Sequence, residues 1–152
     1  MKKILLVLSV SLILFAQEIE ITSQKFEASE NELISKFLGN VQVKRGKNRL
    51  WAEKLFVYFN KQKKPIKFVA IDNVRFDLFD QKNKEYKGKC KKLVYYPNKK
   101  VYQFFDNVHV VTYPDKKEVY GDKIYLDLIA SKVNVAGTKK RPVKMILNIE
   151  EK

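Results

Sequence analysis

The amino-acid sequence predicts an all-β protein, an elongated rolled antiparallel sheet built from repeated pairs of strands. A motif of Gly or Asp followed by Asn and Val occurs three times, at Gly39-Asn40-Val41, Asp72-Asn73-Val74 and Asp106-Asn107-Val108. The segments between turn-forming residues are rich in Val, Ile, Tyr and Phe, often alternating with polar residues, which is typical of half-buried strands. Helical periodicity is almost absent. Pro and Gly mark the expected strand breaks, at Gly46, Pro65, Gly88, Pro97, Pro114, Gly137 and Pro142.

The repeat defines the structural unit. The Asn residues of successive copies are 73 − 40 = 33 and 107 − 73 = 34 positions apart. A second block follows each copy, in the versions Ala52-Glu53-Lys54-Leu55, Cys90-Lys91-Lys92-Leu93 and Gly121-Asp122-Lys123-Ile124, and a fainter half-copy, Ser23-Gln24-Lys25-Phe26, precedes them. Self-similarity at a fixed period indicates stacked supersecondary units. Because both blocks have strand-like patterns, each unit is predicted to be a pair of strands.

The N-terminus has the layout of a secretory signal peptide. Met1-Lys2-Lys3 is basic, Ile4 to Phe15 is apolar, and the small residue Ala16 precedes the expected cleavage point. The apolar run is shorter than the roughly 20 residues that a membrane-spanning helix needs. We therefore predict a signal peptide at residues 1–16 and a single domain at residues 17–152, exported to the bacterial envelope. Leu14, at an atypical position for a cleavage site, leaves an uncleaved anchor open.

The chain is strongly basic. It has 31 Lys and Arg against 17 Asp and Glu, a net charge of +14, and loss of Lys2 and Lys3 with the signal peptide would leave 14 − 2 = 12. Such a charge attracts polyanions: phosphorylated lipids, nucleic acid or acidic polysaccharide. Most individual lysines are dispersed along the strands and are expected to form a solvated outer face. Cys90 is the single cysteine, so no internal disulfide is expected.

Alternation assigns the faces of the strands, since neighbouring side chains in a strand point to opposite sides. One set is uniformly apolar and is predicted to face inward. Its members are Val41, Val43, Val74, Phe76, Val108 and Val110 in the first block, and Leu55, Val57, Phe59, Leu93, Tyr95, Ile124 and Leu126 in the second. Strict alternation would also bury the charged residues Glu53, Lys91 and Asp122, at a high energetic cost. We therefore predict a bulge or corner there, beside the small residues Ala52, Cys90 and Gly121.

Residues suited to catalysis or metal binding are scarce. His109, the only histidine, is predicted to be an outward strand residue, and no Ser lies in a Gly-x-Ser-x-Gly setting. Cys90 is flanked by lysines that would lower its pKa, but it holds the repeat position of Ala52 and Gly121, which the need for a small corner residue explains. We predict no enzymatic activity, no metal site and no cofactor.

The predicted apolar interior has two alternative fillings. It can be packed by its own side chains, or it can stay partly open for a ligand, and the sequence does not separate the two. A basic exterior, an apolar interior and export together favour a groove for the acyl chains of a phosphate-bearing lipid.

In the order and spacing of its motifs, the sequence resembles the periplasmic lipopolysaccharide-transport protein A family (LptA, OstA-like). The resemblance spans nearly all of residues 17–152. The motifs are Ile19-x-Ile21-x-Ser23, Phe37-x-Gly39-Asn40-Val41-x-Val43, Ala52-Glu53-Lys54, Lys64-Pro65 with Phe68, Gly88 with Tyr95, Asn107-Val108, Gly121-Asp122-Lys123-Ile124 and Lys140-Arg141. This chain is shorter and more basic than the family pattern and lacks its polar C-terminal extension.

The resemblance implies a β-jelly roll that is V-shaped in section and open at both ends. It further implies a periplasmic carrier that binds lipopolysaccharide, with the lipid A acyl chains inside the roll. Such proteins stack end to end as homo-oligomers, from an inner-membrane anchor protein to an outer-membrane translocon. Carried over by position, Ile19, Ile21, Phe68 and Tyr95 line the groove. The first strand, near Ile19 to Phe26, and the last, Val143 to Ile149, are expected at sheet edges, where partners can add strands.

Three other interpretations stay open at this point. The sister lipopolysaccharide-transport protein C family shares the fold but keeps a membrane helix at the inner membrane. A structural adaptor would have a roll filled by side chains and would bind no lipid. A secreted basic β-protein would bind acidic glycans or nucleic acid with an affinity that falls steeply as the salt concentration rises. A lipopolysaccharide carrier, by contrast, is not expected to bind nucleic acid.

Overall fold

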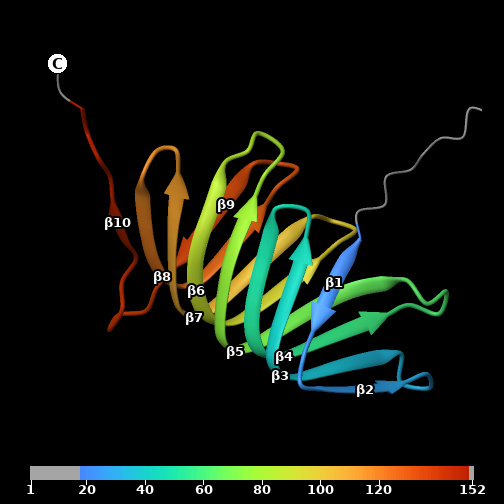
Figure 1. Cartoon of the computed structure of the whole chain (residues 1–152). Helices are drawn as coiled ribbons and strands as arrows, with labels where there is room; N and C mark the ends of the chain where they lie inside the picture. The colour runs from blue at the N-terminus through green and yellow to red at the C-terminus, as the bar shows by residue number, and fades with distance from the viewer. Residues whose placement is uncertain (1–17, 151–152) are drawn as a thin grey trace, which may run out of the picture.

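The computed structural model describes residues 18–150, which form one sheet of 10 antiparallel strands (Figure 1). The strands are β1 (Ile19–Thr22), β2 (Lys25–Ser29), β3 (Ile34–Arg45), β4 (Asn48–Phe59), β5 (Pro65–Phe79), β6 (Glu85–Tyr96), β7 (Val101–Tyr113), β8 (Lys117–Asp127), β9 (Lys132–Ala136) and β10 (Lys144–Ile146). The all-β prediction is confirmed. Within this part of the chain no helix is long and apolar enough to span a membrane. The predicted signal peptide, residues 1–16, lies outside the described residues.

The long strands β3 to β8 follow one another as hairpins and pair in chain order. Two short strands share each outer edge of this central sheet. β1 pairs with the C-terminal half of β3 and β2 with its N-terminal half, and β10 and β9 divide the edge of β8 in the same way. The two edges do not pair with each other, so the sheet is rolled but unclosed. In Figure 1, β1 and β10 lie at opposite ends, as the sequence predicts for the first and last strands.

Each long strand bends near its middle, at the repeated motif. In β3, β5 and β7 the register shifts so that two residues face a single residue of the following strand. The inserted pairs are Gly39-Asn40, Asp72-Asn73 and Asp106-Asn107, and all of these residues have positive φ, between 44° and 83°. Gly and Asn tolerate this left-handed conformation better than other residues do. The motif that repeats in the sequence is therefore the bend of the sheet.

The predicted corner in the second block is confirmed. Glu53, Lys91 and Asp122 are the single residues that face the inserted pairs. In β4, Ala52 and Leu55 are buried while Glu53 and Lys54 between them are exposed, so two successive side chains point outward. The charges therefore stay at the surface. The extra residue itself belongs to the neighbouring strand, which the prediction did not foresee.

The bend divides the sheet into two leaves that face each other across the apolar core. The first leaf consists of β1, β10 and residues 41–45, 48–52, 74–79, 85–90, 108–113 and 117–121 of the long strands. The second leaf consists of β2, β9 and residues 34–38, 54–59, 65–71, 92–96, 101–105 and 123–127. Residues of both leaves form one buried cluster.

Gly88 is not the strand break that the sequence suggested, because it lies inside β6. A Cβ at this position would collide with the carbonyl oxygen of His109 and would lie 2.7 Å from the ring of Phe76. Gly88 thus lets the aromatic ring pack directly against the backbone of the next strands. By contrast, Gly46 and Pro114 lie in the turns that were predicted for them.

Candidate functional site

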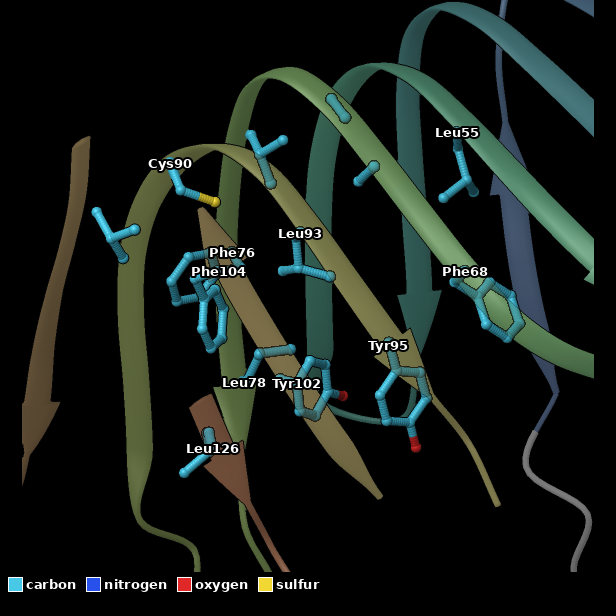
Figure 2. Close-up of a cluster of buried hydrophobic side chains, with 14 of the residues drawn as sticks. Leu55, Phe68, Phe76, Leu78, Cys90, Leu93, Tyr95, Tyr102, Phe104 and Leu126 are labelled. Atoms are coloured by element: carbon cyan, nitrogen blue, oxygen red, sulfur yellow. The ribbon is translucent and has the colours of Figure 1, made fainter. Parts of the chain in front are cut away.

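The interior between the two leaves is the candidate site. Most of the residues predicted to line it belong to the buried core: Val41, Leu55, Val57, Phe68, Val74, Phe76, Leu93, Tyr95, Val108, Val110, Ile124 and Leu126. Ile21, Val43 and Phe59 are partly buried and pack against that core, while Ile19 in the edge strand is 39% exposed. Figure 2 shows part of this core, with Leu55, Phe76, Leu93 and Leu126 among the side chains that converge beneath the bend. Whether they contact a lipid stays a prediction.

An aromatic stack fills the middle of the interior. The ring centroids of Phe76 in the first leaf and Phe104 in the second are 4.6 Å apart. Tyr102 stacks on Tyr95 at 4.3 Å and lies 6.0 Å from Phe104, and both tyrosines are labelled in Figure 2. Burial raises the pKa of the Tyr102 phenol well above its ordinary value. We call these four residues the aromatic stack. Of the two alternatives, an interior packed by its own side chains or one left open for a ligand, the centre of the roll is therefore packed.

A small cavity lies on the β1 side of the stack. The β1-end cavity has a volume of about 70 Å³ and is walled mainly by aliphatic and aromatic side chains. Its lining residues are Ile19, Val43, Arg45, Asn48, Arg49, Leu50, Leu55, Phe68, Ala70, Leu78, Leu93, Tyr95 and Tyr102. Arg45, Asn48 and Arg49 are the polar members of this wall, and within residues 18–150 no Asp or Glu lines it.

A second apolar cavity lies toward the opposite end. The β10-end cavity has a volume of about 190 Å³ and includes Phe104, Val133 and Met145 in its wall, together with Lys84 and Lys117. Pockets that enclose small ligands usually measure about 300–1,000 Å³. Both cavities are smaller, so an acyl chain would enter only if side chains or leaves moved apart.

The exterior is polar and basic. A larger cavity, about 1100 Å³, lies on the outer side of the bend and is lined by polar groups such as Glu53, Asn73 and Arg75, which makes it unsuited to acyl chains. Several outward cations lie over aromatic rings: Arg75 is 5.6 Å from the Trp51 ring centre, and Lys92 is 5.5 Å from that of Phe105. The dispersed positive charge predicted from the sequence therefore covers the outside of the roll.

Cys90 and His109 both contact neighbouring strands or their own strand. The pKa of Cys90 was expected to fall because of the nearby lysines, and this expectation is wrong: burial raises it to about 12, since Sγ points into the core and donates to the carbonyl oxygen of Lys92 at 3.3 Å. His109 stacks on Tyr120 at 4.2 Å and its Nε2 lies 3.4 Å from Glu118 Oε1. Among residues 18–150, no group of three or more His, Cys, Asp or Glu side chains could hold a metal ion.

Sequence reasoning missed part of the interior. Leu50, Ala70, Leu78, Tyr102 and Phe104 also line it. Tyr102 and Phe104 alternate with outward residues just as the predicted positions do, so extending the alternation upstream of each Asp-Asn pair would have found them. Arg45 was missed as well, although it shares the inward parity of Val41 and Val43.

This architecture defines an OstA-like β-jelly roll: an unclosed antiparallel sheet, bent into two leaves around an apolar interior. The chain belongs to the LptA/(LptD N-terminal domain) LPS transport protein family, whose model matches residues 20–133. The resemblance identified from the sequence is thereby confirmed, and the family is one of transport proteins.

A solved structure supports the fold assignment. The chain superposes with a TM-score of 0.75 on LptH from Pseudomonas aeruginosa, described as the LptA homologous periplasmic component of the conserved lipopolysaccharide transport device. The match covers 88% of this chain and 96% of LptH at 14% sequence identity, a likeness that concerns the fold alone. No curated protein sequence matches the chain significantly.

Proposed function

We propose that this chain carries lipopolysaccharide through the periplasm, from the inner toward the outer membrane. The observation that supports the proposal best is the apolar interior of an unclosed roll, with an apolar cavity toward each end. Lipid A acyl chains would lie between the leaves, and the sugars would stay in water. Each methylene buried there contributes about 0.8 kcal/mol. Membership in a family of lipopolysaccharide transport proteins is consistent with this role.

The packed centre sets a condition on this role. Because the aromatic stack separates the two cavities, acyl chains would pass only when the leaves open and Phe76 separates from Phe104. Contacts with the lipid would involve the inward residues predicted from the sequence, from Ile19 in β1 to Leu126 in β8. Binding that buries many methylenes makes release slow, so directional movement would draw its energy from an inner-membrane ATPase complex.

Localisation and partners belong to the same proposal. Residues 1–16 would act as the export signal, and residues 17–152 as the periplasmic domain. The edge strands β1 and β2 at one end, and β9 and β10 at the other, offer unpaired backbone groups for strand addition. Copies of the chain would stack through these edges, and the terminal copies would pair with the inner-membrane anchor protein and the outer-membrane translocon.

A structural adaptor is the second candidate, and the packed centre favours it. A roll that stays filled by Phe76, Phe104 and their neighbours would bridge two membrane machines without binding lipid. The two candidates make opposite predictions about lipid contact in the interior.

Site-specific crosslinking separates them. A photo-crosslinking amino acid is placed at Leu50, which lines the β1-end cavity, and in a matched variant at Trp51, the next residue, which lies on the outer face under Arg75. Cells that express each variant are irradiated and probed for lipopolysaccharide adducts. The carrier predicts an adduct at Leu50 and none at Trp51. Correctly exported and folded variants with no adduct at either position would rule out the carrier and favour the adaptor.

A further inference from the structure

Arg45 is a charged residue on the inward face of the roll. It follows Val41 and Val43 at every second position of β3 and pairs with Ile19 across the sheet edge. Its Nη1 donates a hydrogen bond to the Tyr95 hydroxyl at 3.4 Å, and its guanidinium carbon lies 6.0 Å from the centre of the Tyr95 ring. Since Tyr95 belongs to the second leaf, the Arg45 side chain spans the β1-end cavity from one leaf to the other.

Arg49 also lines the β1-end cavity, but its side chain starts on the outward face of β4, as that of Trp51 does. Its Nη1 donates to the carbonyl oxygens of Gly46 at 2.6 Å and Asn48 at 2.8 Å, in the turn after β3. The carboxylate nearest in register is Asp77, which faces Arg49 across the sheet and has a buried Oδ1 without a hydrogen-bond partner. Arg45, whose side chain points inward, is therefore the guanidinium that a ligand in the β1-end cavity would meet.

We propose that Arg45 binds a phosphate of lipid A while the attached acyl chain occupies the β1-end cavity. The inference rests on the proposed carrier function and specifies where the headgroup is held. A guanidinium forms paired, charge-assisted hydrogen bonds to phosphate oxygens, and a partly buried position protects these bonds from salt. The aliphatic wall beside Arg45 supplies the matching apolar contacts.

The opposite end of the roll is less suited to a phosphate. The β10-end cavity offers Lys84 and Lys117, which are flexible point charges rather than planar forks. The two ends are therefore unequal, and we expect the phosphate at the β1 end.

Matched amphiphiles test the role of Arg45. Binding of dodecyl phosphate and of non-ionic dodecyl maltoside, both below their critical micelle concentrations, is measured by calorimetry with the purified protein and with Arg45→Gln. The loss of a charge-assisted hydrogen bond is expected to weaken dodecyl phosphate binding about 10-fold or more and to leave dodecyl maltoside within about two-fold. Arg75→Gln, on the outer face, is the control and should change neither.

Further binding measurements identify which phosphate-bearing lipid is bound and separate failure of the Arg45 inference from failure of the carrier proposal. Lipid A should bind more tightly than its dephosphorylated form, and this difference should shrink in Arg45→Gln; equal competition by phosphatidylglycerol would overturn the assignment to lipid A. An unchanged phosphate preference in Arg45→Gln would overturn the inference and leave the carrier intact. Failure of the unmodified protein to bind any of these amphiphiles would overturn the carrier as well. If Arg45→Gln does not fold, Arg45→Lys, which keeps the charge but not the fork, should still lose most of the preference.

Discussion

Replacing Asn107 by valine should destabilise the bend of β7, whereas replacing it by glycine should not. Asn107 has φ 55°, and the left-handed region costs L-residues about 1–2 kcal/mol, with β-branched residues the least tolerant. We expect Asn107→Val to lower the free energy of unfolding by about 1–2 kcal/mol. For a domain of this size the melting temperature should fall by about 4–8 °C.

The Asn107 side chain is exposed, so the predicted loss measures the backbone rather than a deleted contact. Asn107→Gly should stay within about 0.5 kcal/mol of the unmodified protein, because the relief of the left-handed strain offsets the entropy of glycine. Urea unfolding followed by Trp51 fluorescence gives both values. Lys89→Val, an exposed substitution in the neighbouring strand β6, controls for the β-branched side chain. Equal stability of Asn107→Val and Asn107→Gly would refute the argument that the repeated motif exists for its backbone conformation.

Three other perturbations test the core. Phe104→Ala should cost about 3–5 kcal/mol, because Phe104 is 1% exposed, whereas its outward neighbour Phe105→Ala should cost clearly less; similar losses in urea unfolding would contradict the two-leaf core. The contribution of Cys90 and Tyr102 to stability should be constant below about pH 9. It should be lost as the pH rises toward 12, by about 1.4 kcal/mol per pH unit for each group that ionises in the unfolded chain, because burial raises the pKa of Cys90 from 9.0 to about 12 and also raises that of Tyr102. Cys90→Ala should make this alkaline slope shallower, and an unchanged slope would count against the burial of the thiol. Gly88→Ala should cost about 1–3 kcal/mol through overpacking, because its Cβ would lie 2.7 Å from the Phe76 ring; a neutral effect would show that the sheet yields there.

Much of the fold follows from the period of two in the strands. Val41, Val74 and Val108 could be assigned inward because side chains alternate across a pleated strand. The break in alternation at Glu53 correctly marked the bend. It was harder to predict that the extra residue lies in the neighbouring strand, because an extra residue in either strand produces the same break in alternation. The tolerance of Asn for the left-handed conformation was the one signal that pointed to the strand with the Asn residues.

The candidate site was harder to predict because it depends on volume and burial. Whether the interior is packed or open is decided by how Phe76 and Phe104 meet across leaves that are distant in sequence. The lysines around Cys90 suggested a lowered pKa, but their charged groups extend outward while the thiol points inward, so desolvation dominates. Lysines that are close to Cys90 in sequence therefore do not reveal whether its thiol is buried.

Because every repeat contains its own bend, the length of the roll and its cross-section are set independently. A repeat of 33 or 34 residues adds two strands, hence about 10 Å of roll at the usual spacing between strands. The length of each leaf along the strands depends on where the Asn residues interrupt each strand. The roll can therefore become longer or shorter by whole repeats while the lengths of its two leaves stay the same.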